Sequence, residues 1–98
     1  MQYFINISNN NTLHPYYQDA YHDLHKKYGI KTILFYDKNK EKDITNGFHA
    51  DDTIETYPYT SHDDLIQQIL SIPYKDIYYI NTFDEKLILI TNHIKQLC

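Results

Sequence analysis

A continuous apolar run at residues 32–36 (TILFY) constrains the fold of this chain more than any other feature. Asp37 ends the run, and the run is too short for a helix. An uninterrupted apolar segment of this length is typical of a central strand in a parallel sheet, because such a strand is covered on both faces. Parallel strands need long crossover connections, which are usually helices. The run therefore predicts an α/β domain.

Other strand signals lie on both sides of this run. Residues 3–7 (YFINI) are rich in aromatic and β-branched side chains, which indicates a short strand. Residues 52–57 alternate weakly in polarity and fit a short edge strand, whereas residues 77–80 (IYYI) predict another buried strand.

The first helix is predicted between Pro15 and Gly29. Proline suits the first turn of a helix, and glycine is favoured immediately after its end. The apolar residues between them recur at helical spacing and predict one buried stripe: Tyr17, Ala20, Tyr21, Leu24 and Tyr28.

Two further helices are predicted from their capping residues. Ser61 can cap the second helix, with Asp64 three residues later, and Pro73 lies beyond its end. Thr82 and Glu85 have the spacing of a capping box for the third helix. The predicted buried faces are Leu65, Ile66, Ile69 and Leu70 in the second helix, and Leu87, Ile90, Ile94 and Leu97 in the third.

Together these elements predict a small Rossmann-like three-layer α/β domain that spans residues 1–98. Strands that alternate with helices imply a mostly parallel sheet, here of four strands with three helices. The expected strand order is 3-2-1-4, which is half of a doubly wound fold. A length of 98 residues is that of a single domain.

Composition excludes several classes of partner. The net charge is −4 and the chain has no Arg, whereas nucleic-acid binding usually relies on Arg and on basic patches, so no nucleic acid is expected. No run approaches the roughly 18 apolar residues of a membrane span, so no membrane partner is expected. Cys98 is the single cysteine, which precludes an internal disulfide and favours a cytoplasmic location.

The candidate binding site follows from the predicted strand order. Ligands of open α/β sheets bind outside the carboxyl ends of the strands, where the strand order reverses. In the order 3-2-1-4 this point lies between the first and fourth strands, and loops 8–14 and 81–85 flank it. The candidate substrate-binding residues in these loops are Asn9, Asn10, Asn11, His14, Asp84 and Glu85. Each has a structural alternative, because Asn favours turns and acidic residues favour the first turn of a helix.

Other chemistries find less support in the sequence. Loop 8–14 has no glycine, which disfavours a dinucleotide site, so Asp37 at the end of the second predicted strand reads as a solvated strand end. Asp19, His22 and His25 have ligand-like spacing, but they are expected on the solvated side of the first helix, and no metal site is assigned. Cys98 has no assigned base, and no catalytic residue is predicted.

Taken in order, several segments resemble the N-terminal (pre-ATP-grasp) domain of ATP-grasp carboxylate–amine ligases. The matching segments cover nearly the whole chain: FINI, SNNNTLHPYY, KKYGIKTILFYD, FHADDTIETYPY, SHDDLIQQIL and DIYYINTFDEKLILITNHIKQL. Many members of that family carry a basic or glycine-bearing pattern after the first strand, and this chain has SNNNTLH there.

The resemblance implies a structural platform that contributes part of a substrate pocket and is not catalytic alone. It implies ATP and magnesium only for the ATP-grasp domain, which these residues do not include, so no cofactor is assigned to this chain. The implied partner is a downstream ATP-grasp domain, with self-association through the last helix as a substitute. Residues Leu87, Ile88, Leu89 and Ile90 are apolar on more than one face of that helix, which predicts a docking surface there. The alternative is a stand-alone module that binds a small molecule or another protein.

Overall fold

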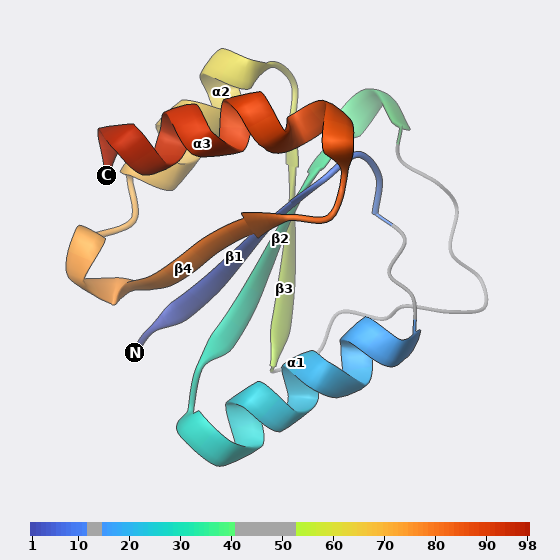
Figure 1. Cartoon of the computed structure of the whole chain (residues 1–98), viewed down its shortest axis with the longest axis vertical. Coiled ribbons are helices and arrows are strands. Elements are labelled where there is room, and N and C mark those ends of the chain that lie inside the picture. Colours follow the sequence, from blue (N-terminus) through green and yellow to red (C-terminus); the bar gives the residue numbers. More distant parts are fainter. Residues whose placement is uncertain (12–14, 41–52) are drawn as a thin grey trace.

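The computed structural model describes residues 1–11, 15–40 and 53–98, and Figure 1 shows their arrangement. The strands are β1 (Tyr3–Ser8), β2 (Lys31–Asp37), β3 (Ile54–Tyr59) and β4 (Ile77–Thr82). The helices are α1 (Pro15–Tyr28), α2 (His62–Leu70) and α3 (Ile88–Leu97). Three short 3-10 turns join them: η1 (Lys38–Lys40), η2 (Tyr74–Asp76) and η3 (Glu85–Leu87).

The four strands form one parallel sheet in the order β3-β2-β1-β4. This order confirms the predicted fold class and makes β1 and β4 neighbours. Ile5 lies opposite Ile80 and Ile7 lies opposite Thr82, so the carboxyl ends of both strands lie side by side. The loops that follow them therefore begin side by side (Figure 1).

Helices cover the sheet on both faces, with α2 and α3 on one side and α1 on the other (Figure 1). Successive side chains of a β-strand point to opposite faces of the sheet. Ile5 and Ile7 belong to the larger core, which includes buried residues of α2 and α3. Phe4 packs instead against Tyr21 of α1, with ring centroids 5.5 Å apart.

The TILFY run forms the middle of β2, and every one of its residues is buried. Ile33 and Phe35 belong to the core beneath α2 and α3, whereas Leu34 belongs to the core beneath α1. Burial on both faces explains why this segment has no polar alternation. The prediction of a central strand is confirmed.

Residues 77–80 lie in a strand as predicted, but the prediction that this strand is buried is wrong. These residues lie in β4, which is an edge strand, so only Ile80 is buried while Tyr78 and Tyr79 are half exposed. Lys95 of α3 reaches the edge and places its Nζ 4.4 Å from the centre of the Tyr79 ring. A charged side chain at an exposed edge disfavours pairing with another strand.

Two predicted helix boundaries are confirmed by their capping contacts. Gly29 has a φ of 68°, which glycine adopts without a steric penalty, and its N–H donates to the His25 carbonyl at 2.8 Å. Ser61 Oγ accepts a hydrogen bond from the Asp64 N–H at 3.0 Å. The Asp64 carboxylate in turn accepts from the Thr60 N–H at 2.9 Å.

The predicted capping box of Thr82 and Glu85 is wrong. Asp84 caps the turn before α3, because its Oδ1 accepts a hydrogen bond from the Lys86 N–H at 2.9 Å. Thr82 Oγ1 accepts a hydrogen bond from the Asp84 N–H at 3.1 Å, whereas a capping box requires the N–H of Glu85. The Thr82 hydroxyl also donates to the carbonyl of Ile7 at 2.7 Å, a long-range contact that the local pattern does not include.

Four residues of the predicted helix faces are exposed: Ala20, Tyr28, Leu70 and Leu97. The last three each end their helix, where a side chain reaches past the sheet surface that the rest of the helix covers. Thr91 is buried in α3 beside Ile94, although the apolar pattern did not select it. Helical spacing identified the direction of each buried face but not its length.

Candidate functional site

A cavity of about 500 Å³ lies where β1 and β4 end. Residues 6–10 line it from β1 and the following turn, and residues 83–86 line it from the turn after β4. Tyr17 of α1 completes the lining. The cavity therefore occupies the point where the strand order reverses, which is where ligands of open α/β sheets bind.

Thr82 holds the two sides of this cavity together. Its hydroxyl donates to the Ile7 carbonyl at 2.7 Å, which joins the end of β4 to the end of β1. The same oxygen accepts a hydrogen bond from the Asp84 N–H at 3.1 Å. The turn that leads into α3 is thereby held against β1 by side-chain contacts as well as by the sheet.

Aromatic side chains form one wall of the cavity. The rings of Tyr17 and Phe83 are stacked, with centroids 4.5 Å apart and planes 21° apart. Phe83 nevertheless remains 55% exposed, so a large part of its ring is available to another molecule. An exposed aromatic surface beside a polar floor can hold a flat apolar group while leaving hydrogen bonds to set its orientation.

Asn6 supplies the most unusual polar group of the cavity. Its side chain is only 2% exposed, and among the residues that the structure describes no donor reaches its Oδ1. Buried polar atoms in native proteins almost always have a partner. Asn9, further along the same turn, has its Oδ1 occupied by Lys40 Nζ at 2.8 Å.

Charged groups stand at the rim. Asp84, Glu85 and Lys86 follow one another in the turn before α3. The Tyr59 hydroxyl donates to the Ser8 carbonyl at 3.3 Å. Burial is the main reason that the pKa of Tyr59 is raised to about 12, and the negative charges of Asp37 and Asp84 contribute to the same rise. Tyr59 therefore stays neutral and keeps its hydrogen bond near neutral pH.

Four of the six predicted binding residues line this cavity: Asn9, Asn10, Asp84 and Glu85. Asn11 is buried and is not part of the lining, and His14 lies outside the described residues. The predicted roles of these residues in binding stay predictions.

Six residues that line the cavity were not among the predicted binding residues: Asn6, Ile7, Ser8, Tyr17, Phe83 and Lys86. Two of them carried a signal that could have been used. Asn6 is a polar residue inside the apolar FINI segment, and Phe83 is an aromatic residue inside the polar NTFDE turn. Polar residues in buried strands and aromatic residues in turns both depart from the usual pattern.

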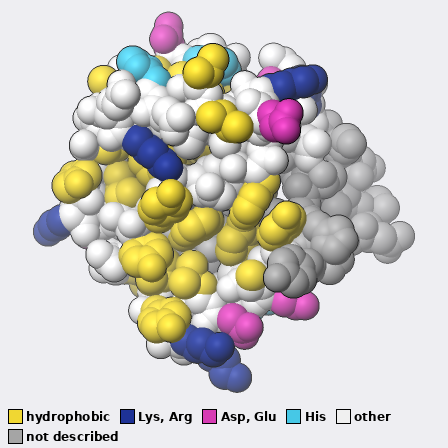
Figure 2. Space-filling view, in the orientation of Figure 1, with side chains coloured by type: hydrophobic (Ala, Val, Ile, Leu, Met, Phe, Trp, Pro, Cys, Tyr) yellow, Lys and Arg dark blue, Asp and Glu magenta, His cyan; other side chains and the backbone are white. Residues whose placement is uncertain are grey.

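A second cavity of about 370 Å³ lies on the face that α2 and α3 partly cover. Its lining includes Tyr3, Phe35 and Tyr57 from the strands and residues 71–73 from the segment after α2. Figure 2 shows apolar side chains gathered across the middle of the surface that lies between α3 and α1 in Figure 1. This cavity lies away from the ends of β1 and β4.

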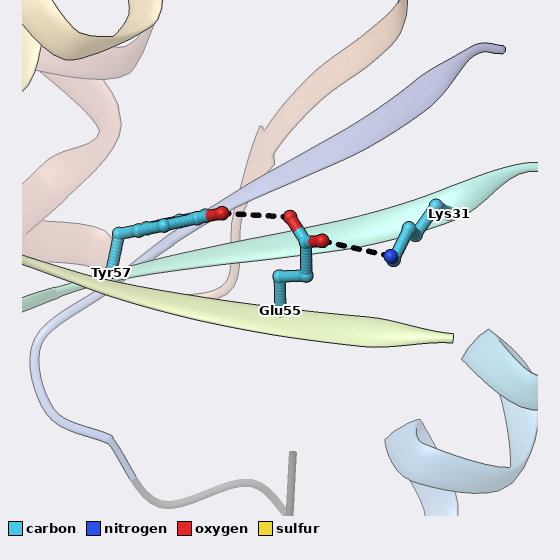
Figure 3. Close-up of polar contacts among 3 residues, drawn as sticks. All are labelled: Lys31, Glu55 and Tyr57. Carbon is cyan, nitrogen blue, oxygen red and sulfur yellow. Dashed lines mark hydrogen bonds and ion pairs between the residues drawn. The ribbon is translucent and has the colours of Figure 1, made fainter. Parts of the chain in front are cut away.

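A polar cluster adjoins the second cavity (Figure 3). Glu55 pairs with Lys31 Nζ at 2.8 Å and accepts a hydrogen bond from the Tyr57 hydroxyl at 2.8 Å. The bond from Lys31 is the main reason that the pKa of Glu55 is lowered, and the bond from Tyr57 adds to it. With both carboxylate oxygens engaged, this cluster is accounted for as a link between β2 and β3.

The remaining chemical hypotheses find no site in the described part of the chain. Within residues 1–11, 15–40 and 53–98, no three His, Cys, Asp or Glu side chains come together as metal ligands. Burial raises the pKa of the Cys98 thiol, which disfavours the reactive thiolate. No helix in these ranges combines the length and the apolar character that crossing a membrane requires.

Comparisons of the chain with protein-family models, with curated proteins and with solved structures found no match.

Proposed function

We propose that this domain binds a small polar molecule in the cavity at the ends of β1 and β4. The single observation that carries the proposal is the position of the cavity, at the reversal point of a parallel sheet in the order β3-β2-β1-β4. A volume of about 500 Å³ is within the range of small-molecule sites.

The chemistry of the lining supports binding as the function. It offers amide groups from Asn6, Asn9 and Asn10, an aromatic wall, and charges of both signs at the rim. These groups can orient a ligand through hydrogen bonds and stacking. Among the described residues, none that lines the cavity is a cysteine or a histidine.

The test is a screen of small polar compounds against the purified chain by two-dimensional NMR. Binding in this cavity is expected to shift the amide signals of residues 8–10 and 83–86 together. Glu85→Ala is expected to weaken a hit that contacts the rim, and because Asp84 provides the helix cap, this change leaves the cap in place. Asp23→Ala changes the net charge equally on the exposed side of α1 and serves as the matched control. Hits that shift only signals elsewhere would contradict the proposal.

The resemblance to pre-ATP-grasp domains leads to a second proposal, in which this cavity is part of the substrate pocket of an ATP-dependent carboxylate–amine ligase. The exposed apolar residues at the start of α3 support it, since Leu89 is 84% exposed and Ile88 is nearly half exposed. Such residues suit a surface that another domain covers.

This second proposal expects no ATP turnover and no tight ATP binding by the 98 residues alone. Isothermal titration with ATP and magnesium checks both points, and tight binding with a defined stoichiometry would count against the proposal. An ATP-grasp coding region in the same reading frame would support it. Leu89→Glu is then expected to weaken docking of that region while leaving the thermal unfolding temperature of the domain unchanged.

A further inference from the structure

We infer that Asn6 determines the specificity of the β1–β4 cavity, and that its ligand is a planar ring that carries an N–H or O–H donor. This inference rests on the proposed binding function and names the ligand class for the same cavity. It starts from Asn6 Oδ1, a buried acceptor that receives no hydrogen bond from any described residue.

The neighbouring strands do not satisfy this oxygen. Asn6 follows Phe4 on the α1 side of β1. Its register partner in β2, Leu34, has no side-chain donor, and the amide of its partner in β4, Asn81, does not donate to it. A buried carbonyl without a donor is unfavourable for folding. A residue of this kind at the wall of a cavity is explained by a ligand that supplies the missing donor.

Three other buried oxygens also lack partners among the described residues: Tyr21 Oη, Thr32 Oγ1 and Thr91 Oγ1. All three are hydroxyl oxygens, and their residues are absent from the lining of both cavities described above. Asn6 alone of the four combines an unpartnered oxygen with a place in the wall of a cavity. This distinction points to recognition at Asn6 and to ordinary packing at the others.

The aromatic wall sets the shape of the ligand. Phe83 is stacked on Tyr17 through one face and remains 55% exposed. A flat ring packs against such a surface in an offset or edge-on arrangement, which lets a substituent point toward the floor. A ring with a donor substituent would therefore cover the exposed face of Phe83 and donate a hydrogen bond to Asn6 Oδ1 at the same time.

The test uses two probes of nearly equal shape, benzamide and methyl benzoate. Both carry a ring and a carbonyl, but only benzamide offers an N–H donor. NMR titration of the wild-type chain is expected to show about tenfold tighter binding of benzamide, the ratio that one well-formed hydrogen bond provides. The Asn6→Leu variant, which keeps a similar side-chain volume without the acceptor, is expected to bind both probes equally.

Phe83→Leu provides the second variant, so that the test does not depend on Asn6→Leu folding. Phe83→Leu is expected to weaken the binding of both probes while keeping the preference for benzamide, because Asn6 is intact. Equal binding of the two probes by the wild type, or a preference that survives Asn6→Leu, would overturn the inference and leave the binding function standing. Failure of both probes to shift any signal of residues 6–10 or 83–86 would also overturn the inference, whereas the proposed binding function is decided by the screen of small polar compounds.

Discussion

Thr82 Oγ1 lies 2.7 Å from the carbonyl oxygen of Ile7, and this hydrogen bond joins the ends of two strands that are 75 residues apart in the chain. The strands are already paired at this position, since Ile7 and Thr82 are register partners. The side-chain bond adds a second connection at the point where both chains leave the sheet. The cavity begins immediately beyond it.

Replacing Thr82 by Val should destabilise the domain by about 1–2 kcal/mol, because it removes this donor and also the acceptor for the Asp84 N–H. Urea unfolding measures the change. Thr82→Ser keeps the hydroxyl and should lose much less stability. Equal stability of the Val variant and the wild type would show that the bond does not hold the two ends together.

Stability should fall at alkaline pH through the ionisation of Tyr59. Its pKa is raised to about 12 in the folded chain from an ordinary value of 10.0, so its contribution is complete below pH about 10 and is lost as the pH rises toward 12. Unfolding free energies at pH about 8 and about 11 should therefore differ less in Tyr59→Phe than in the wild type. Tyr57, whose pKa is also raised, stays in both proteins, so some alkaline loss should remain in the variant.

Replacing side chains of α3 by alanine should distinguish its buried residues from its exposed ones by their effect on stability. Ile94 is fully buried, and Ile94→Ala should cost about 2–5 kcal/mol through lost burial and the cavity that it leaves. Leu89→Ala is the matched control on the same helix and should change the free energy of unfolding by no more than about 0.5 kcal/mol. Chemical unfolding monitored by circular dichroism checks both. A large loss in Leu89→Ala would mean that Leu89 packs inside the domain in solution.

The Lys31–Glu55 ion pair should affect the pKa of Glu55 more than it affects the free energy of unfolding. The Lys31→Met variant is expected to raise the pKa of Glu55 toward its ordinary value of 4.5, because the bond from Lys31 is the largest cause of the lowering. Carboxyl carbon NMR titration measures this shift, and Tyr57→Phe should give a smaller one. The variant should lose at most about 1 kcal/mol, as is usual for a pair with solvent access.

The lowered pKa also sets the direction of the acid response. The contribution of Glu55 is present above pH about 4.5 and is lost as the pH falls through its folded pKa. Lys31→Met should reduce that part of the acid sensitivity. An unchanged Glu55 titration in Lys31→Met would contradict the assigned cause.

The fold class could be predicted because strand and helix patterns are carried by each segment, and the strand order followed from the topology rules for alternating strands and helices. The uninterrupted TILFY run indicated a strand buried on both faces, and Gly29 marked the end of α1 through a φ that glycine adopts easily. The reversal point of the predicted order then indicated a binding site between two loops. Both loops contribute residues to the lining of one cavity.

The same local reasoning was wrong at β4 and at the start of α3. Residues 77–80 look equally apolar whether one face or two are covered, although the predicted order already implied an edge position, where Tyr78 and Tyr79 are half exposed. Thr82 and Glu85 have the spacing of a capping box, but Thr82 Oγ1 accepts from the Asp84 N–H while its hydroxyl donates to Ile7. A pattern over four residues does not include an acceptor that lies in a distant strand.

The sequence by itself determined the order and type of the elements, because apolar spacing and capping residues act within a few residues of one another. Only the tertiary structure decided the exposure of Leu89, the partnering of Thr82 and the isolation of Asn6 Oδ1. Each of these depends on which distant side chains arrive at a given position. In the sequence Asn6 is one polar residue in a strand, and it becomes a candidate recognition group only because no described residue donates a hydrogen bond to its Oδ1 in the fold.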